Sequence, residues 1–222
     1  QGSWIAAWKY PPQLQVASVK KVLFQTGRTG RVAVILALEP VMLGDKRVTR
    51  VNIGSVKRWR QLDVGSGDLI SLSLAGLGIP RLDEVVWRAM RQSDASPLPD
   101  ERGTLDCFRD TAACREQFLA RLIWLGQRQA LDIPGLGPSG WQQLLQAHRF
   151  EHPFSWLALP PEALHLTPGF SPQRAAALWH RFNLTRRMPL PRWIKALGLP
   201  LPEQALLSLA DVRWPQLMRW NE

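Results

Sequence analysis

The chain contains little cysteine and no long apolar run. Two cysteines in 222 residues are too few for a disulfide framework and indicate a protein of a reducing compartment. No apolar run approaches the ~20 residues that span a membrane, and no secretory signal peptide is visible. We therefore expect a chain that does not enter membranes. Because its first residue is Gln1, we also expect a fragment or a processed product.

Several catalytic motifs are absent as well. The sequence has no Gly-x-Ser-x-Gly, no His-Glu-x-x-His and no P-loop, which argues against the enzyme classes that carry them. A Gly-x-Gly-x-x-Gly match runs from Gly135 to Gly140, but Leu119–Leu131 before it has helical spacing, and Pro138 falls inside the loop. Because a dinucleotide-binding fold needs a strand before this loop, we reject that interpretation.

Acidic residues are outnumbered by basic ones. There are 18 Asp and Glu against 28 Lys and Arg, which gives a net charge of +10 and a pI of about 10.7. The excess lies mainly in residues 1–88, with 13 basic and 6 acidic residues, whereas residues 89–222 have 15 and 12. A balance of this size favours a polyanionic partner, either nucleic acid or an acidic membrane surface.

The stretch 13–88 has the pattern of a small β-barrel. Three strand-like runs come first, then a short helix that Ser55 can cap, then two further runs. Three strands, a helix and two strands is the order of an oligonucleotide-binding (OB) barrel. The expected strands are 16–24, 32–38, 48–53, 69–74 and 85–87, and the expected helix is 56–62.

A polar, proline-containing linker at 93–100 leads into a helical half that begins at Glu116. There, Ile133–Pro138 reads Ile-Pro-Gly-Leu-Gly-Pro between two helical segments, which is typical of a helix-hairpin-helix (HhH) motif. Its glycines let a DNA backbone approach, and amides at the next helix N-terminus point at a phosphate. Two degenerate copies follow at Leu166–Ser171 and Leu197–Pro202. We therefore expect an α+β, multidomain chain in which an OB-fold β-barrel precedes an all-α HhH domain.

Two segments near the start carry a family resemblance. Ala7–Pro12 reads Ala-Trp-Lys-Tyr-Pro-Pro, and Gln25–Arg31 reads Gln-Thr-Gly-Arg-Thr-Gly-Arg. The pair resembles the bacterial NAD-dependent DNA ligases, in which Ala-Trp-Lys-Phe-Pro-Pro closes the adenylation domain and Gln-Val-Gly-Arg-Thr-Gly opens the OB barrel. The chain is most similar to the C-terminal part of the short B form, which lacks the BRCT domain. The resemblance extends over essentially the whole sequence.

The resemblance implies four segments: 1–12 as the end of the adenylation domain, 13–88 as the OB barrel, 89–117 as a linker with a degenerate zinc-finger remnant, and 118–222 as the HhH domain. It implies an enzyme that transfers AMP from NAD to a lysine, then to the 5′-phosphate of a nick, and then joins the 3′-hydroxyl. NAD and a divalent metal such as magnesium would be its cofactors. The nucleophilic lysine of Lys-x-Asp-Gly is missing here, so this chain alone should be inactive.

The same resemblance implies a monomer bound to nicked double-stranded DNA in the bacterial cytoplasm, associated with the nucleoid and serving replication and repair. Lys9 would contact the AMP phosphate as the final lysine of the adenylation pocket. An arginine, a threonine hydroxyl and bare amides in a glycine-bracketed loop suit a phosphate. The residues expected to bind DNA are Lys20, Lys21, Gly27, Arg28, Thr29, Arg31, Gly135, Gly137 and Gly169. For Lys20, Lys21 and Arg31, a solvated basic face is an equal alternative.

The linker of the family carries four cysteines that bind zinc, of which Cys107 and Cys114 remain. Two thiolates cannot close a tetrahedral structural site, so we expect two ordinary thiols and no zinc. His148 and His152 have a spacing that binds metal on a helix, but Pro153 follows at once and no carboxylate is set as a third ligand. We expect no metal there either.

One segment departs from the family pattern. Leu74–Pro80 reads Leu-Ala-Gly-Leu-Gly-Ile-Pro where the family has Arg-Ala-Gly-Asp-Val-Ile-Pro, which removes two polar groups from the barrel face. A second interpretation stays open: a non-catalytic, structure-specific DNA-binding module of a repair protein, since OB barrels and HhH repeats both occur there. The Ala7–Pro12 segment discriminates, because a pure binding module has no use for it.

Overall fold

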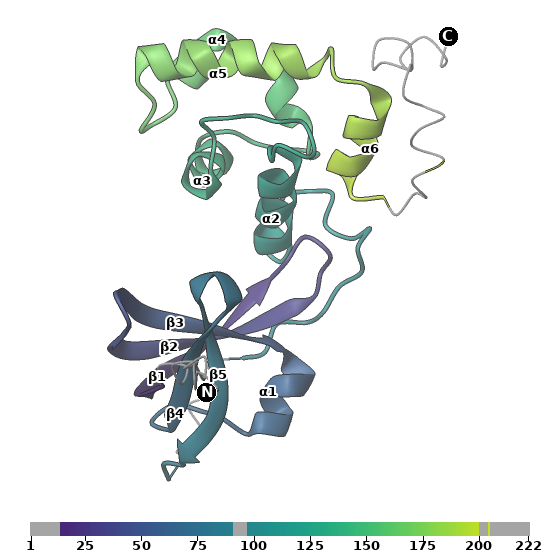
Figure 1. Cartoon of the computed structure of the whole chain (residues 1–222). Helices are drawn as coiled ribbons and strands as arrows, with labels where there is room; N and C mark the ends of the chain where they lie inside the picture. The colour runs from purple at the N-terminus through teal and green to yellow at the C-terminus, as the bar shows by residue number, and fades with distance from the viewer. Residues whose placement is uncertain (1–13, 91–96, 200–203, 205–222) are drawn as a thin grey trace, which may run out of the picture. The chain divides into compact units, whose positions relative to one another are not determined.

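The computed structural model of the chain describes residues 14–90, 97–199 and 204 (Figure 1). Lys9 and residues 200–202, the second half of the third expected hairpin, lie outside these residues. The chain divides into two compact units, Gln1–Gln25 with Val32–Asp100 and Thr26–Arg31 with Glu101–Glu222. The short connection between the first two strands therefore groups with the second unit, and each unit is described by itself below.

The first unit is a five-stranded antiparallel sheet with one helix. Its elements follow the expected order of three strands, a helix and two strands, and the sheet order is β3-β2-β1-β4-β5 (Figure 1). The two edge strands, β3 and β5, contact each other, so the sheet curls into a half-barrel. The elements are β1 (Gln15–Thr26), β2 (Val32–Leu43), β3 (Lys46–Ser55), α1 (Val56–Leu62), β4 (Leu69–Ala75) and β5 (Ile79–Trp87).

Apolar side chains on the strands form the core of this unit. Val34 and Leu36 on β2 are fully buried, as are Ile70 and Leu72 on β4. On β2 the intervening Ile35 is also buried, so at this point both faces of the strand are covered. Each such side chain contributes roughly 1.5–3 kcal/mol through removal from water. The expected strands were too short mainly at β5, where Ile79–Leu82 already pair with β4.

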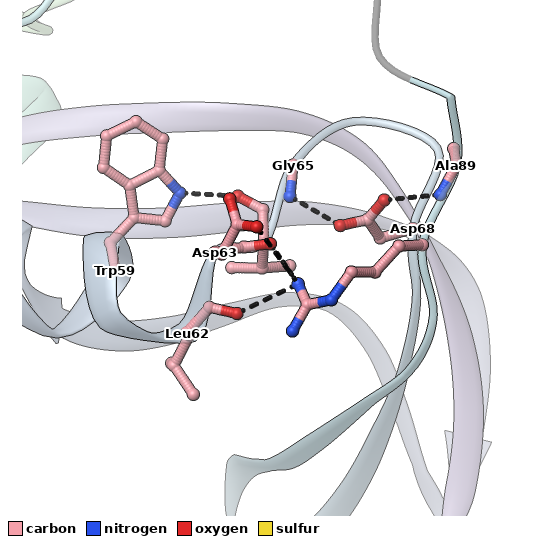
Figure 2. Close-up of polar contacts among 8 residues, drawn as sticks. Trp59, Leu62, Asp63, Gly65, Asp68 and Ala89 are labelled. Atoms are coloured by element: carbon pink, nitrogen blue, oxygen red, sulfur yellow. Dashed lines mark hydrogen bonds and ion pairs between the residues drawn. The ribbon is translucent and has the colours of Figure 1, made fainter.

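The helix α1 begins and ends as its local sequence dictates. The Ser55 hydroxyl accepts a hydrogen bond from the Arg58 amide at 3.2 Å, which satisfies one of the free amides of the first turn. Asp63 closes the helix in the left-handed conformation, with a φ of 48°. The Trp59 indole then donates to the Val64 carbonyl oxygen at 2.7 Å, so the turn after the helix is fixed by a side chain of the helix itself (Figure 2).

A buried carboxylate organises the turn before β4. Asp68 is fully buried, and its two oxygens accept hydrogen bonds from the backbone amides of Gly65 and Ala89, each at 2.9 Å (Figure 2). Nearby, the Arg88 guanidinium donates to the Leu62 carbonyl at 3.1 Å and to that of Asp63. Asp68 thus ties the turn between α1 and β4 to the end of β5.

The second unit is helical and packs around aromatic side chains. Trp141, Trp156 and Phe182 are buried together, with ring centroids 4.7–6.2 Å apart. The Trp141–Trp156 pair is edge-to-face and the Trp141–Phe182 pair is stacked, and such ring contacts stabilise the core beyond the area that they bury. The helices are α2 (Arg115–Leu125), α3 (Pro138–Ala147), α4 (Pro161–His165), α5 (Pro172–Thr185) and α6 (Leu190–Leu197), with a 3-10 turn at Ser155–Ala158 (Figure 1).

One sequence-based boundary in this unit is wrong. The apolar spacing predicts helix through Leu131, but α2 ends at Leu125 and Gly126 caps it. The residues that follow turn back on the helix: the Leu131 amide donates to the Leu125 carbonyl, and Asp132 has a φ of 51°. Ala130 and Leu131 are nonetheless fully buried, so their apolar spacing reflects a packed turn rather than a helix. Across the described ranges, no helix is both long enough and apolar enough to cross a membrane.

We predict that Asp68→Ala lowers the free energy of unfolding of the first unit by roughly 2–4 kcal/mol, because the buried Gly65 amide and the half-buried Ala89 amide lose their acceptor. The matched control is Asp83→Ala, which removes an exposed carboxylate paired with Arg81 at 3.1 Å and should change stability by less than about 1 kcal/mol. Urea unfolding combined with hydrogen exchange of the β4 amides measures both. Equal losses in the two variants would contradict the role given to Asp68.

Candidate nucleic-acid interface

The loop Thr26–Arg31 is a tight turn closed by its own backbone. The Gly27 amide donates to the Arg31 carbonyl at 2.9 Å, and the Gly30 amide donates to the Gly27 carbonyl at 3.0 Å. Gly30 has a φ of +81°, and a Cβ at this position would lie 2.0 Å from the Arg102 carbonyl oxygen. Only glycine fits there, since both the dihedral angle and the available space exclude a side chain.

The first turn of α2 and the segment before it hold this loop from one side. The Thr26 amide donates to a Glu116 carboxylate oxygen at 2.8 Å, and the Gln117 amide group donates to the Arg28 carbonyl at 3.2 Å. The Arg102 amide donates to the Gly30 carbonyl at 3.2 Å. Three points of the loop backbone are therefore fixed by hydrogen bonds to residues far away in the sequence.

The Arg28 side chain lies against an aromatic ring of α2. Its guanidinium carbon is 4.1 Å from the centroid of the Trp124 ring, and Arg28 is half-buried. The Trp124 indole nitrogen donates to the Lys195 carbonyl at 2.7 Å, which fixes the orientation of the ring. Thr29, at the tip of the loop, is also half-buried. The loop thus presents an arginine whose rotamer is restricted by stacking.

A second arginine adds positive charge beneath the loop. Arg121 is buried; its guanidinium lies 4.0 Å from the Phe108 ring centroid and donates to the carbonyls of Thr104 and Asp106 at 2.7 Å. Burial lowers the pKa of Arg121, the like charge of Arg28 lowers it further, and the Asp106 carboxylate raises it. Because Arg28 and Arg121 repel each other, an anion beside them would be stabilised.

The two cysteines do not behave as expected. Cys107 and Cys114 form a disulfide, with their Cα atoms 5.2 Å apart, so the expectation of two ordinary thiols is wrong. The cause is local: Cys107 adopts a φ of 59°, and the Cys114 amide donates to the Thr111 carbonyl at 3.0 Å, which turns the chain back. The number of cysteines alone does not predict a disulfide between two residues so close in sequence.

Metal ligands are not gathered in the described part of the chain. Within residues 14–90, 97–199 and 204, no group of three or more His, Cys, Asp or Glu side chains could hold a metal ion. His148 instead shares a 2.7 Å hydrogen bond with the Thr167 hydroxyl, and His152 accepts one from the Phe154 amide at 3.1 Å. Burial lowers the pKa of His148, opposed by its contact with the Ala163 backbone. The expectation that zinc is absent stays a prediction.

The first expected hairpin leaves its glycines open. Gly135 has a φ of +84°, and a Cβ on either Gly135 or Gly137 would have no neighbour within 4 Å. Gly137 is the N-cap of α3, Pro138 occupies the first turn, and no side chain caps this helix end. The early amides of α3, those of Ser139 and Gly140, are therefore not capped by a side chain and lie beside an open backbone surface.

The second expected hairpin is more closed. A Cβ on Gly169 would lie 2.5 Å from the side-chain nitrogen of Gln143, so a side chain of α3 covers this glycine. At the start of α5, the Ser171 hydroxyl accepts a hydrogen bond from the Arg174 amide at 3.1 Å. Both observations make this turn less accessible to a phosphate than the first one.

Arg174 links the two turns. Its guanidinium lies 4.4 Å from the Phe170 ring centroid in the second turn and donates to the Gly135 carbonyl in the first at 3.4 Å. A surface hollow of about 220 Å³ lies beside it, lined by Pro134, Gly135, Arg174, Ala177, Leu178 and Arg181. The sequence motifs did not single out Arg174 or Arg181, although their spacing of seven along α5 places them on one helix face.

The remaining sequence-predicted residues lie on exposed surface. Lys20, Lys21 and Arg31 are exposed, and Lys20 lies 3.9 Å from the Glu39 carboxylate, a weak contact at the surface. The structure therefore brings Gly27, Arg28 and Thr29 together on one loop and places the hairpin glycines on two other turns. Sequence reasoning missed Gln117 and Trp124, and no spacing rule could find them: Gln117 is 89 residues from its partner Arg28.

Comparison with known families supports the assignment of the first unit. Residues 16–94 match the family model of the NAD-dependent DNA ligase OB-fold domain. The match begins and ends close to the barrel expected from the sequence, and it includes the Thr26–Arg31 loop. The OB-fold sheet together with the helices of the second unit is consistent with the expected α+β class.

We predict that the chain, purified without reductant and then denatured, shows almost no free thiol, and that reduction releases two. Because the disulfide constrains the unfolded chain, reduction should lower the stability of the second unit by roughly 2–3 kcal/mol. Thiol titration and urea unfolding with and without reductant measure the two effects. In the Cys107→Ala, Cys114→Ala double variant the reductant should have no effect; two free thiols in the untreated protein would contradict the pairing.

Proposed function

We propose that this chain is the DNA-binding, C-terminal part of a short, B-type NAD-dependent DNA ligase. The observation that carries the proposal is the match of residues 16–94 to the OB-fold domain of this family. It is supported by the glycine loop, which is held rigidly and bears an arginine beside a second, buried arginine. The net charge of +10 suits a nucleic-acid backbone.

In this proposal the whole enzyme transfers AMP from NAD to a lysine and then to the 5′-phosphate of a nick, before the 3′-hydroxyl displaces AMP. The described residues include no group of three or more His, Cys, Asp or Glu side chains that could hold a divalent metal. The hollow beside Gly135 is lined by arginines and apolar groups, and we do not assign a nucleotide to it. We therefore place no step of AMP transfer on these residues. Lys9, expected to contact the AMP phosphate, lies outside them.

The work of the described residues is to hold the nicked duplex. Arg28 and Thr29 would bind backbone phosphate near the nick through the guanidinium, the hydroxyl and the loop amides. The first turn would act as a helix-hairpin-helix element, with the open amides beyond Gly137 donating to a second phosphate. The second turn would contribute less, because Gln143 covers Gly169 and Ser171 already caps α5. Such contacts position the duplex without reading its sequence.

A second function, a non-catalytic DNA-binding module of a repair protein, uses the same contacts. The two are separated by joining this chain to its upstream coding sequence and assaying nick sealing. A ligase requires a Lys-x-Asp-Gly segment upstream and forms a lysine–AMP adduct with NAD. A binding module does neither.

The proposal is tested by the salt dependence of binding. We predict that the chain binds nicked and intact duplexes of unrelated sequence, with a log–log slope of about −0.9 for each phosphate neutralised. Arg28→Ala should weaken binding by about tenfold or more and reduce the magnitude of the slope by about one. Fluorescence anisotropy at several salt concentrations measures both quantities.

The matched control for Arg28→Ala is Arg187→Ala, which removes an exposed arginine from the second unit and should reduce affinity only slightly. In the full-length enzyme, Arg28→Ala should slow sealing and leave self-adenylation intact, because that step needs no DNA. Equal losses for the two arginines, or loss of self-adenylation, would refute the assignment of this loop to the DNA backbone.

The first turn gives an independent prediction. Gly137→Ala adds a methyl group to open space at a negative φ, but alanine is a poorer N-cap than glycine, so the free energy of unfolding should fall by only about 0.5–1 kcal/mol. DNA affinity should nevertheless fall by about tenfold, since the methyl group stands where a phosphate would approach the amides of α3. The control Ala147→Ser adds one atom at the exposed opposite end of the same helix and should bind normally. Unchanged binding by Gly137→Ala would remove this turn from the interface.

A further inference from the structure

We propose that Trp124 is a positioning residue for DNA binding: it holds the Arg28 guanidinium in the orientation that meets the phosphate. The inference rests on the proposed role of the Thr26–Arg31 loop and extends it to a residue of α2. Trp124 itself need not touch DNA, because its effect is transmitted through the arginine that stacks on it.

The first support is the stacking geometry. With its carbon 4.1 Å from the Trp124 ring centroid, the guanidinium covers the ring face. Stacking uses the flat face of the guanidinium and leaves its N–H donors, which lie in the plane, for an acceptor such as phosphate. The ring cannot turn freely, because its nitrogen donates to the Lys195 carbonyl at 2.7 Å. The ring therefore provides a surface of fixed orientation on which the Arg28 guanidinium stacks.

The second support is that Arg28 is held at its backbone too. Gln117, almost fully buried, donates from one amide nitrogen to the carbonyls of Arg28 and Gly103, at 3.2 and 3.1 Å. A Cβ on Gly198 would lie 3.0 Å from one guanidinium nitrogen of Arg28, so backbone approaches the arginine at its far end as well. A long side chain fixed at both ends loses little conformational entropy when it binds a ligand.

The third support is electrostatic. Among the described residues, no carboxylate forms an ion pair with Arg28. The nearby Glu116 carboxylate accepts from the Thr26 amide. The positive charge of Arg28 lowers the pKa of the neighbouring Arg121, whereas the Asp106 carboxylate raises it, so the negative charge of Asp106 acts on Arg121. An arginine that served only to join elements of the fold would gain more from a carboxylate partner than from a neighbour of like charge. The arrangement instead suits an arginine kept ready for an external anion.

The test is a set of variants whose affinity for a nicked duplex is measured together with their unfolding midpoint. Trp124→Leu keeps apolar volume but removes the ring face, and it should weaken binding about fivefold to tenfold. Trp124→Phe keeps a ring face and should retain most of the wild-type affinity for the nicked duplex. The control Trp179→Leu changes an exposed tryptophan of α5 and should leave affinity unchanged.

The decisive readout is the coupling between the two residues. If Trp124 acts through Arg28, the double variant Arg28→Ala, Trp124→Leu should bind no more weakly than Arg28→Ala alone. Additive losses would overturn the proposal, because Trp124 would then act elsewhere. Wild-type affinity of a folded Trp124→Leu, in a protein that Arg28→Ala does weaken, would also overturn it and leave the proposed function intact. No effect of Arg28→Ala itself would instead refute the role of the loop.

Arg28→Lys provides a test that does not depend on the folding of Trp124→Leu. Lysine keeps the positive charge but cannot stack as a plane and present donors at its edge at the same time. We expect Arg28→Lys to lose most of the affinity that Arg28→Ala loses, and Trp124→Phe to have no further effect in that background. Wild-type affinity for Arg28→Lys would show that charge alone suffices and would overturn the positioning role.

Discussion

The hydrogen bonds from the first turn of α2 to the Thr26–Arg31 loop are the constraint on which the candidate interface depends. Glu116 accepts from the loop at Thr26, and Gln117 donates to it at Arg28. A glycine-bracketed loop has many accessible conformations by itself, and binding a phosphate would have to select one of them. Because α2 fixes the backbone of the loop, the Arg28 side chain starts from a defined position, and stacking on Trp124 restricts it further.

The segment before α2 is in turn ordered by that helix. Its backbone between Gly103 and Asp106 is irregular, and its carbonyl groups must find donors outside regular structure. Gln117 supplies one to Gly103, and Arg121 supplies others to Thr104 and Asp106. The disulfide then closes the chain just before the helix begins. Two side chains of α2 and one covalent bond therefore order the segment that precedes the helix.

Features set by neighbours in sequence were predictable. The order of strands and helix in the first unit follows from apolar alternation, Ser55 caps α1 as its position indicates, and Pro138 begins α3. Each of these features depends on residues within one turn or one strand, so a short segment of sequence is enough to predict it. The predicted end of α2 was wrong because Ala130 and Leu131 are buried in a turn. Apolar spacing alone does not distinguish a buried turn from a buried helix.

The features that define the interface were not predictable in this way. The stacking of Arg28 on Trp124 joins residues far apart in the chain, and neither residue has an unusual local context that marks it as one of a pair. The disulfide was missed for a different reason: the expectation came from composition, which reports on the cellular compartment, whereas the pairing depends on a left-handed residue at Cys107. The stacking and the disulfide both depend on the three-dimensional arrangement of the chain, which a sequence motif does not specify.

The two glycine turns show that the space around a glycine indicates phosphate binding better than a match to the sequence motif does. By sequence, the second turn differs from the first mainly in having Ser171 in place of a glycine. In the structure a larger difference is that Gln143 covers the Cα of Gly169, whereas a Cβ built on Gly135 or Gly137 would meet no atom within 4 Å. A phosphate approaching the second turn would have to displace a side chain and compete with the Ser171 hydroxyl for the Arg174 amide. At the first turn no side chain covers the glycines, and Arg174 and Arg181 line the adjoining hollow. The same peptide pattern therefore supports a phosphate contact at the first turn and a mainly structural role at the second.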